Sequence, residues 1–341
     1  MKIKILFSAA LLSTLYSLLS LSAHAESGNF DLDRWYGILN DIQAKAIEQG
    51  ISNHTINEVI QPSVFIPSII KKDRNQSEFK LNLSEYLKRT VNADRIAQGR
   101  KMRVKYPTLL GKTETKYGVP RNVILAFWGM ESNFGNFKAQ YKLSDAFLTL
   151  IYDGRRETFF TKQLFALMKI ADKSRLEIGG IGGSWAGAMG HFQFIPTTLE
   201  QYGADGNGDG KIDIINNISD AMFSAGNYLN KLGWATNEKI VAAVHLPADF
   251  DASLCEGKTK KTLAEWAADG IDVPAGDETV GIVCDASAIS HQPSADSQTD
   301  YGLTAVGYLT YPNFYRIKKW NNSNWYAVAI ALLSEGLRTK D

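Results

Sequence analysis

The chain has 341 residues, of which 45% are hydrophobic, with 37 lysines and arginines against 36 aspartates and glutamates. This composition is typical of a folded globular protein of one or two domains and excludes a disordered or fibrous chain. The formal net charge of +1 leaves no excess of basic residues for a phosphate backbone, so we expect no nucleic-acid partner.

The N-terminal segment predicts export from the cytoplasm. Two lysines precede an apolar run over residues 5–21, and Ala23 and Ala25 occupy the −3 and −1 positions of a signal peptidase site. We therefore expect residues 1–25 to form a signal peptide cleaved after Ala25; a membrane anchor is the alternative. No cysteine lies near this boundary, which argues against a lipoprotein. No later run reaches the roughly 20 apolar residues needed to span a bilayer.

Residues 26–110 predict an N-terminal helical region. Apolar residues recur at helical spacing from Asp31 to Gln49, after Ser52, which suits an N-cap, and over residues 77–103. Pro107 ends this region, because proline cannot continue a helix begun before it.

Residues 111–235 predict a second helical region, interrupted by a glycine-rich stretch over 179–190 and an Asp/Gly stretch over 205–213. We expect its helix boundaries at Pro120 in a first turn, at Ser144 and Ser219 as N-caps, and at Gly233 just past an end.

Residues 236–310 change to short apolar runs separated by glycine, proline and aspartate, which predicts a small β-rich insert. The insert contains both cysteines, Cys255 and Cys284. Outside the cytoplasm we expect them to form a disulfide; two separate buried thiols are the alternative. Residues 311–341 then predict a return to the core, with a helix over 321–337.

One carboxyl group continues an apolar helix face. Ile124, Phe127, Trp128 and Glu131 are spaced at i, i+3, i+4 and i+7, near the expected C-terminal end of a helix. Burial and the negative potential of that helix end both favour the protonated carboxyl group, as a general acid at neutral pH requires. The alternative is a glutamate that reaches solvent or takes a backbone partner.

The wider sequence resembles the family B lytic murein transglycosylases of bacteria that have an outer membrane. The resemblance rests on W-G-M-E-S-N-F-G at residues 128–135 and G-S-W-A-G-A-M-G-H-F-Q-F-I-P at residues 183–196. Shorter matches follow in the family's order at residues 75–79, 205–213, 220–221, 313–315 and 321–326. Trp185 stands where some members have tyrosine. The resemblance implies a mainly α (α+β) fold in which residues 111–235 form a lysozyme-like catalytic core.

The resemblance also implies an activity: cleavage of the β-1,4 bond between N-acetylmuramic acid and N-acetylglucosamine in peptidoglycan, with a 1,6-anhydromuramyl product. Glu131 would act first as general acid and then as base, so that one carboxyl group replaces the pair used by most glycosidases. The family residues that line the glycan groove or support the glutamate match Ser184, Gln193, Tyr228, Asn321 and Tyr326. A periplasmic monomer acting on peptidoglycan strands, with no cofactor for the chemistry, is the corresponding expectation.

Residues 205–216 fit an EF-hand-like calcium loop. Oxygen ligands stand at loop positions 1, 3, 5 and 9 and glycine at position 6, but Asn216 replaces the bidentate glutamate of position 12, so affinity should be lower. Asp220 resembles the acid that closes the longer loop of the family, which would then span residues 205–220. The expected ligands of a structural Ca²⁺ are Asp205, Asn207, Asp209, Lys211, Asp213 and Asp220. A solvated Asp/Gly turn is the alternative.

Two other functions compete with the transglycosylase. A lysozyme-type muramidase would use the same groove but add water to the cleaved bond. A non-catalytic, calcium-stabilised glycan-binding protein would not need Glu131. A serine peptidase is disfavoured because Ser184 lacks the G-x-S-x-G setting.

Overall fold

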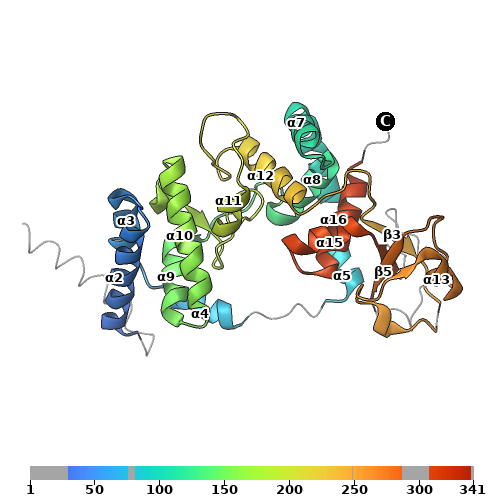
Figure 1. Cartoon of the computed structure of the whole chain (residues 1–341), viewed down its shortest axis with the longest axis horizontal. Helices are drawn as coiled ribbons and strands as arrows, with labels where there is room; N and C mark the ends of the chain where they lie inside the picture. The colour runs from blue at the N-terminus through green and yellow to red at the C-terminus, as the bar shows by residue number, and fades with distance from the viewer. Residues whose placement is uncertain (1–29, 76–80, 248, 286–306, 339–341) are drawn as a thin grey trace, which may run out of the picture.

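A computed structural model describes residues 30–75, 81–247, 249–285 and 307–338, and the predicted signal peptide lies outside them. The described chain is mainly helical with two small antiparallel sheets, which confirms the expected fold class (Figure 1). No described helix is long and apolar enough to cross a membrane.

The N-terminal region begins with α2 (Leu32–Glu48), α3 (Asn53–Ile60) and α4 (Pro67–Arg74). The side chains of Asp31 and Ser52 accept backbone N–H groups at the starts of α2 and α3, as expected of caps.

The helix expected over residues 77–103 is wrong. The structure has two helices instead, α5 (Leu83–Thr90) and α6 (Ala93–Lys105), while residues 77–80 lie outside the described part. The chain leaves helical geometry at Val91, and the Asn92 side chain accepts the N–H of Arg95 to start α6. Pro107 does end α6, and it also begins α7 (Pro107–Tyr117), because the first turn of a helix tolerates proline.

The central helices are α8 (Arg121–Ser132), α9 (Leu143–Asp153), α10 (Glu157–Ser174), α11 (Pro196–Tyr202) and α12 (Ile218–Lys231). Pro120, expected in a first turn, is the residue directly before α8, whereas Gly233, with φ of +87°, follows α12 as predicted. Between them lie the short helix η1 (Ile178–Gly180) and a two-stranded sheet of β1 (Tyr141–Lys142) and β2 (Gly182–Gly183).

The caps expected at Ser144 and Ser219 are wrong. Both serines lie one residue inside their helices. The side chain of Asn217 caps α12, and α9 begins after Lys142 without any side-chain cap. Tertiary contacts hold the start of α9 instead, since Leu143 and Ser144 are both fully buried.

The insert contains four antiparallel strands in the order β3-β6-β5-β4, which confirms its β character. The strands are β3 (Val241–Val244), β4 (Lys261–Thr262), β5 (Thr279–Cys284) and β6 (Gly307–Thr310). Cys255 and Cys284 form the expected disulfide. The insert also contains η2 (Ala252–Leu254) and a helix that was not expected from the sequence, α13 (Leu263–Ala268). Trp266 of α13 is fully buried in a hydrophobic cluster that is separate from the main core.

The chain returns to the central helices through α15 (Pro312–Trp320) and α16 (Asn324–Gly336), as expected. The last helix starts at Asn324 rather than at Asn321, because Asn321 ends α15 and the Ser323 side chain caps α16. In Figure 1 these two helices lie between the insert and the central helices, and α16 packs against α8.

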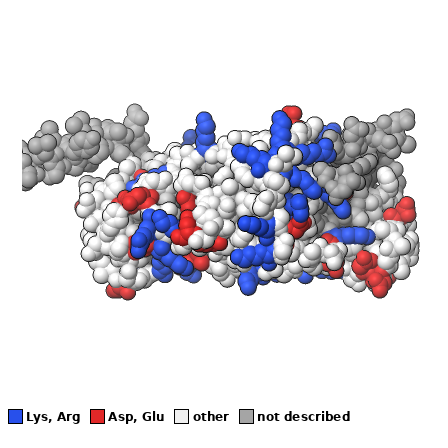
Figure 2. Space-filling model, turned by 90° about the horizontal axis from the view of Figure 1, so that it is seen from above, with Lys and Arg blue, Asp and Glu red and all other residues white. Residues whose placement is uncertain are grey.

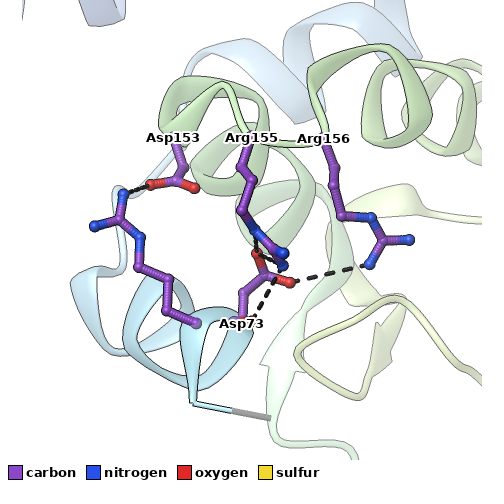
Figure 3. Close-up of polar contacts among 5 residues, drawn as sticks. Asp73, Asp153, Arg155 and Arg156 are labelled. Atoms are coloured by element: carbon purple, nitrogen blue, oxygen red, sulfur yellow. Dashed lines mark hydrogen bonds and ion pairs between the residues drawn. The ribbon is translucent and has the colours of Figure 1, made fainter.

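Crossed ion pairs fasten α4 to the α9–α10 turn. Asp73, whose side chain is 1% exposed, accepts hydrogen bonds from Arg155, with Arg156 4.0 Å away (Figure 3). The neighbouring Arg74 pairs in the opposite direction with Asp153. One acid and one base of α4 thus pair with opposite charges of the turn, and these ion pairs hold the N-terminal helices to the central ones.

We expect Asp73→Asn to lower the free energy of unfolding by about 1–3 kcal/mol, since it leaves Arg155 without its buried partner. Urea unfolding followed by circular dichroism measures the change. Asp41→Asn is the matched control, because its ion pair with Lys45 is more than half exposed and should leave the midpoint unchanged. Equal midpoints for both variants would contradict a structural role for the Asp73 cluster.

Candidate active site

Glu131 lies in the last turn of α8; the residue is partly exposed, and its carboxyl group is surrounded mostly by protein atoms. The rest of that helix is almost entirely buried, from Val123 to Gly129. Burial raises the pKa of Glu131 from 4.5 to about 7, because a charged carboxylate is poorly solvated there. The carboxyl group is therefore about half protonated at neutral pH.

Two aromatic side chains donate hydrogen bonds to the same oxygen of Glu131. Tyr326 Oη lies 2.5 Å and Trp320 Nε1 3.1 Å from Glu131 Oε1. Both bonds lower the pKa of Glu131 and partly oppose the effect of burial. Burial and the nearby glutamate hold the pKa of Tyr326 well above its usual value, so this phenol stays protonated and remains a donor.

Trp320 and Tyr86 belong to this site although the sequence analysis did not select them. Burial, and after it the charge of Glu131, raises the pKa of Tyr86, so this α5 residue lies within electrostatic range of the carboxyl group. Trp320 directly precedes the matched residues 321–326, and Tyr86 stands in a run of helical spacing. From the sequence both look like ordinary core aromatics, because only the fold shows which aromatic side chains lie near Glu131.

Aromatic rings continue from Trp320 along one side of Glu131. The ring centroid of Tyr228 lies 4.9 Å from that of Trp320, and Tyr202 stacks on Tyr228 at 4.5 Å. All three residues are partly exposed. Partly exposed rings in a row are suited to contacts with the apolar faces of sugars.

Ser184 and Gln193 shape the glycine-rich loop and make no hydrogen bond to Glu131. The Ser184 hydroxyl accepts the N–H of Ala188 at 3.0 Å, and the Gln193 amide donates to the carbonyl of Gly190 at 2.9 Å. Gln193 has a φ of +49°, an unusual value for a residue other than glycine. Its neighbour Phe194 contacts the Trp320 ring, so the loop lies beside the aromatic row.

His191 connects the glycine-rich loop to α8. Trp128 Nε1 donates to His191 Nδ1 at 3.1 Å, and the Ser132 hydroxyl donates to the His191 carbonyl at 2.6 Å. These two residues flank Glu131 on α8, so residues 128–135 and 183–196 meet as the sequence required. Asn321, by contrast, is exposed at the end of α15, and no hydrogen bond of its side chain is found among the described residues.

No second carboxyl group contributes to the pKa of Glu131 within the described ranges. The next acids in the chain have other partners: Asp145 accepts the N–H of Val64, and Asp153 pairs with Arg74. The site therefore offers one carboxyl group that can exchange a proton near neutral pH.

The Asp/Gly loop folds back on itself through its own acids. Asp205 accepts the N–H groups of Gly208 and Gly210, which lower its pKa. Asp220 is fully buried and accepts the N–H groups of Gly206 and Asp213 at 2.9 and 2.8 Å, which closes the loop. Burial raises the pKa of Asp220.

The donor types of this loop suit Ca²⁺, which prefers carboxylate and carbonyl oxygens. Asp205, Asn207, Asp209 and Asp213 supply such oxygens. Asn216 donates to Asp213 Oδ2 at 3.0 Å rather than supplying a bidentate carboxylate. Among the described residues, the only three His, Asp or Glu side chains with ligand atoms within 4.8 Å of one another are His54, Glu58 and Glu177, so the loop acids are more widely spread.

Comparison with known proteins places the chain in a family. Residues 35–335 match the family model described as "Transglycosylase SLT domain". The chain belongs to this family. It is 28% identical over 260 residues to membrane-bound lytic murein transglycosylase B of Escherichia coli (strain K12), over 74% of this chain and 66% of that relative. The alignment thus covers slightly less than two thirds of the relative's length.

Solved structures of similar proteins agree with this assignment to the SLT family. SltB3 of Pseudomonas aeruginosa, solved in complex with NAG-anhNAM-pentapeptide, superposes with a TM-score of 0.80 and 33% identity, over 89% of this chain and 79% of SltB3. Slt35 of Escherichia coli, solved in complex with calcium, superposes with a TM-score of 0.74 and 24% identity, over 88% of this chain and 92% of Slt35. This is a likeness of fold.

We expect Glu131→Gln to stabilise the protein at pH 8 by up to about 3 kcal/mol and to leave its stability at pH 4 unchanged. A carboxyl group with a raised pKa in the folded state binds its proton more tightly there than in the unfolded chain. Stability contributed by that proton is complete below about pH 4.5 and is lost as the pH rises towards 7. Urea unfolding at both pH values measures the difference, and an equal change at pH 4 and pH 8 would contradict the raised pKa.

Proposed function

We propose that the protein is a lytic transglycosylase of peptidoglycan, which cleaves the β-1,4 bond between N-acetylmuramic acid and N-acetylglucosamine and leaves a 1,6-anhydromuramyl end. The observation that carries the proposal is Glu131: a carboxyl group with a pKa of about 7, held by two donors, in a chain of the SLT family.

Glu131 acts first as a general acid. In its protonated form it donates a proton to the glycosidic oxygen as the bond to the muramyl carbon breaks. The carboxylate left behind keeps the hydrogen bonds from Tyr326 and Trp320, which are stronger to a charged acceptor than to a neutral one. These two positioning residues therefore stabilise the product of the proton transfer more than its starting state.

Glu131 then acts as a base. Its carboxylate takes the proton of the muramyl C6 hydroxyl, whose oxygen bonds to the muramyl C1 carbon and closes the 1,6-anhydro ring. The carboxyl group regains the proton that it lost, so the cycle balances without water and without a second acid. Glycosidases that hydrolyse usually need two carboxyl groups for the same overall cleavage.

The residues around Glu131 would supply the binding surface for the glycan. Tyr228, with Trp320 and Tyr202, would contact sugar faces, and Ser184, Gln193 and Asn321 would supply hydrogen bonds. Gly187, at φ +99°, lets the backbone pass directly over Phe147, where a Cβ atom would lie 2.4 Å from the ring. A peptidoglycan ligand is supported by SltB3, which was solved with NAG-anhNAM-pentapeptide.

Digestion of purified murein sacculi tests the function directly. We expect anhydromuramyl ends by mass spectrometry, and we expect Glu131→Gln to lower the cleavage rate by at least about a thousandfold while the far-UV circular dichroism stays unchanged. Asp145→Asn is a control that should keep most activity, since its carboxyl group faces Val64 and Lys142.

Other outcomes of this digestion identify the competing functions. Reducing muramyl ends would indicate a lysozyme-type hydrolase. Sacculus binding without cleavage, unaffected by Glu131→Gln, would indicate a non-catalytic glycan-binding protein.

We further propose that the loop over residues 205–220 holds a structural Ca²⁺. The ligands would be the side chains of Asp205, Asn207, Asp209 and Asp213 and the backbone carbonyl of Lys211, with Asp220 closing the loop. The ion would hold the loop and, through the bond from the His191 N–H to the Ile214 carbonyl, the segment beside α8. It has no part in the proton transfers.

We expect Ca²⁺ to raise the melting temperature, by a stabilisation of about 2.7 kcal/mol when its concentration is 100 times the dissociation constant. Chelation should reverse the shift, and Asp205→Asn combined with Asp209→Asn should abolish it. Asp41→Asn should keep it. A melting temperature independent of Ca²⁺ would leave the loop as a solvated turn.

The proposed setting is the periplasm. Residues 1–25 would be a signal peptide cleaved after Ala25 without lipidation, and the mature protein would be a monomer. We propose the division into residues 26–110, 111–235, 236–310 and 311–341 as its N-terminal region, catalytic core, insert and C-terminal return.

A further inference from the structure

Positive charge is concentrated in one part of this nearly neutral chain. Residues 81–121, which include α5, α6 and α7, contain ten basic and three acidic residues, although the whole chain is balanced at 37 against 36. Figure 2 shows lysine and arginine side chains gathered over the half of the upper face that carries α7. We call the exposed side of α6 and α7 the basic face.

Most of this charge is not neutralised by neighbours. Arg121, paired with Glu114, is the only residue of 81–121 with a basic side chain in an ion pair found in the described part of the chain. Lys101, Lys105 and Lys112 are all exposed. Basic side chains that outnumber the acidic ones and form no ion pairs with them attract an anionic partner over about one Debye length.

The basic face points away from the catalytic carboxyl group. The Phe134 ring fills the space between Gly99 of α6 and Gly129 of α8, where an added Cβ atom would lie less than 3 Å from it. Glu131 is two residues beyond Gly129, or about 200° around the helix. The outer surface of α6 therefore lies behind α8, so a partner bound there leaves the groove free.

An exposed apolar side chain stands among these charges. Val104 of α6 is 80% exposed, more than any other exposed large hydrophobic residue described, and Arg103 and Lys105 flank it. A soluble polyanion gains little from such a side chain. A bilayer surface accepts it below the head groups while the lysines remain at the phosphates.

We infer that the basic face docks the protein on a membrane surface rich in anionic phospholipid, with the groove turned away from the bilayer. The docking is peripheral and reversible. Membrane binding itself does not depend on the proposed catalytic activity. If the protein cleaves peptidoglycan as proposed, docking would restrict cleavage to substrate within one protein diameter of the membrane.

Co-sedimentation with lipid vesicles tests this inference. We expect the full chain without its signal segment to bind phosphatidylglycerol vesicles, to bind phosphatidylcholine vesicles far more weakly, and to dissociate as salt is added. Each lysine near an anionic surface contributes about a fivefold change in partition, so replacing Lys101, Lys105 and Lys112 together by glutamine should lower binding about a hundredfold.

The matched control carries the same charge change elsewhere. Lys162, Lys169 and Lys173 of α10 are exposed, and their joint replacement by glutamine should change vesicle binding by no more than about twofold. Val104→Ser should lower vesicle binding about fivefold and leave binding to heparin, a soluble polyanion, unchanged. All variants should keep the wild-type melting temperature and sacculus digestion.

Three results would overturn the inference. The first is absence of binding to phosphatidylglycerol vesicles. The second is an equal effect of the two triple variants. The third is a pair of results: the first triple variant loses binding to heparin or to isolated sacculi, and Val104→Ser has no effect on vesicle binding. That pair would assign the basic face to a soluble or cell-wall polyanion.

Discussion

The burial of one ionisable carboxyl group is the constraint on which the rest of this structure depends. Glu131 lies in the last turn of α8 and accepts hydrogen bonds from Trp320 of α15 and Tyr326 of α16; burial and, after it, the charge of Glu131 raise the pKa of Tyr86 of α5. The first and the last of these residues, Tyr86 and Tyr326, are 240 residues apart in the sequence. A carboxyl group with a pKa near neutrality therefore exists only when the N-terminal region, the central helices and the C-terminal return have all assembled.

The same convergence explains the positions of the loops. The glycine-rich loop is connected to α8 through His191 and contacts the row of aromatic rings through Phe194. The Asp/Gly loop is connected to the glycine-rich loop through the Ile214 carbonyl, which accepts the N–H of His191. Most of the residues that hold these loops are neither acids nor bases that the chemistry uses. Other side chains thus hold the loops in place, apart from the one carboxyl group to which we assign both proton transfers.

Sequence reasoning failed where a local signal competed with a tertiary one. The run over residues 77–103 has the apolar spacing of one helix, but Asn92 offers a cap that divides it. Serine is a good N-cap residue in isolation, but Ser144 is buried inside α9. The oxygen of the Asn217 side chain caps α12 in place of Ser219. In the insert, α13 is only six residues long, too short for periodicity to reveal.

The amino-acid sequence alone determined the helical periodicity, the apolar stripe that ends at Glu131, the pairing of the only two cysteines and the motifs that indicate the family. These features depend on residues close together in the chain or on residue types without competitors. Only the tertiary structure decided which aromatic rings meet the carboxyl group, that Ser184 and Gln193 support a loop, and that α6 packs on the side of α8 away from Glu131. Those facts depend on contacts between distant segments, and the free energy of such contacts comes from burial that no local pattern records.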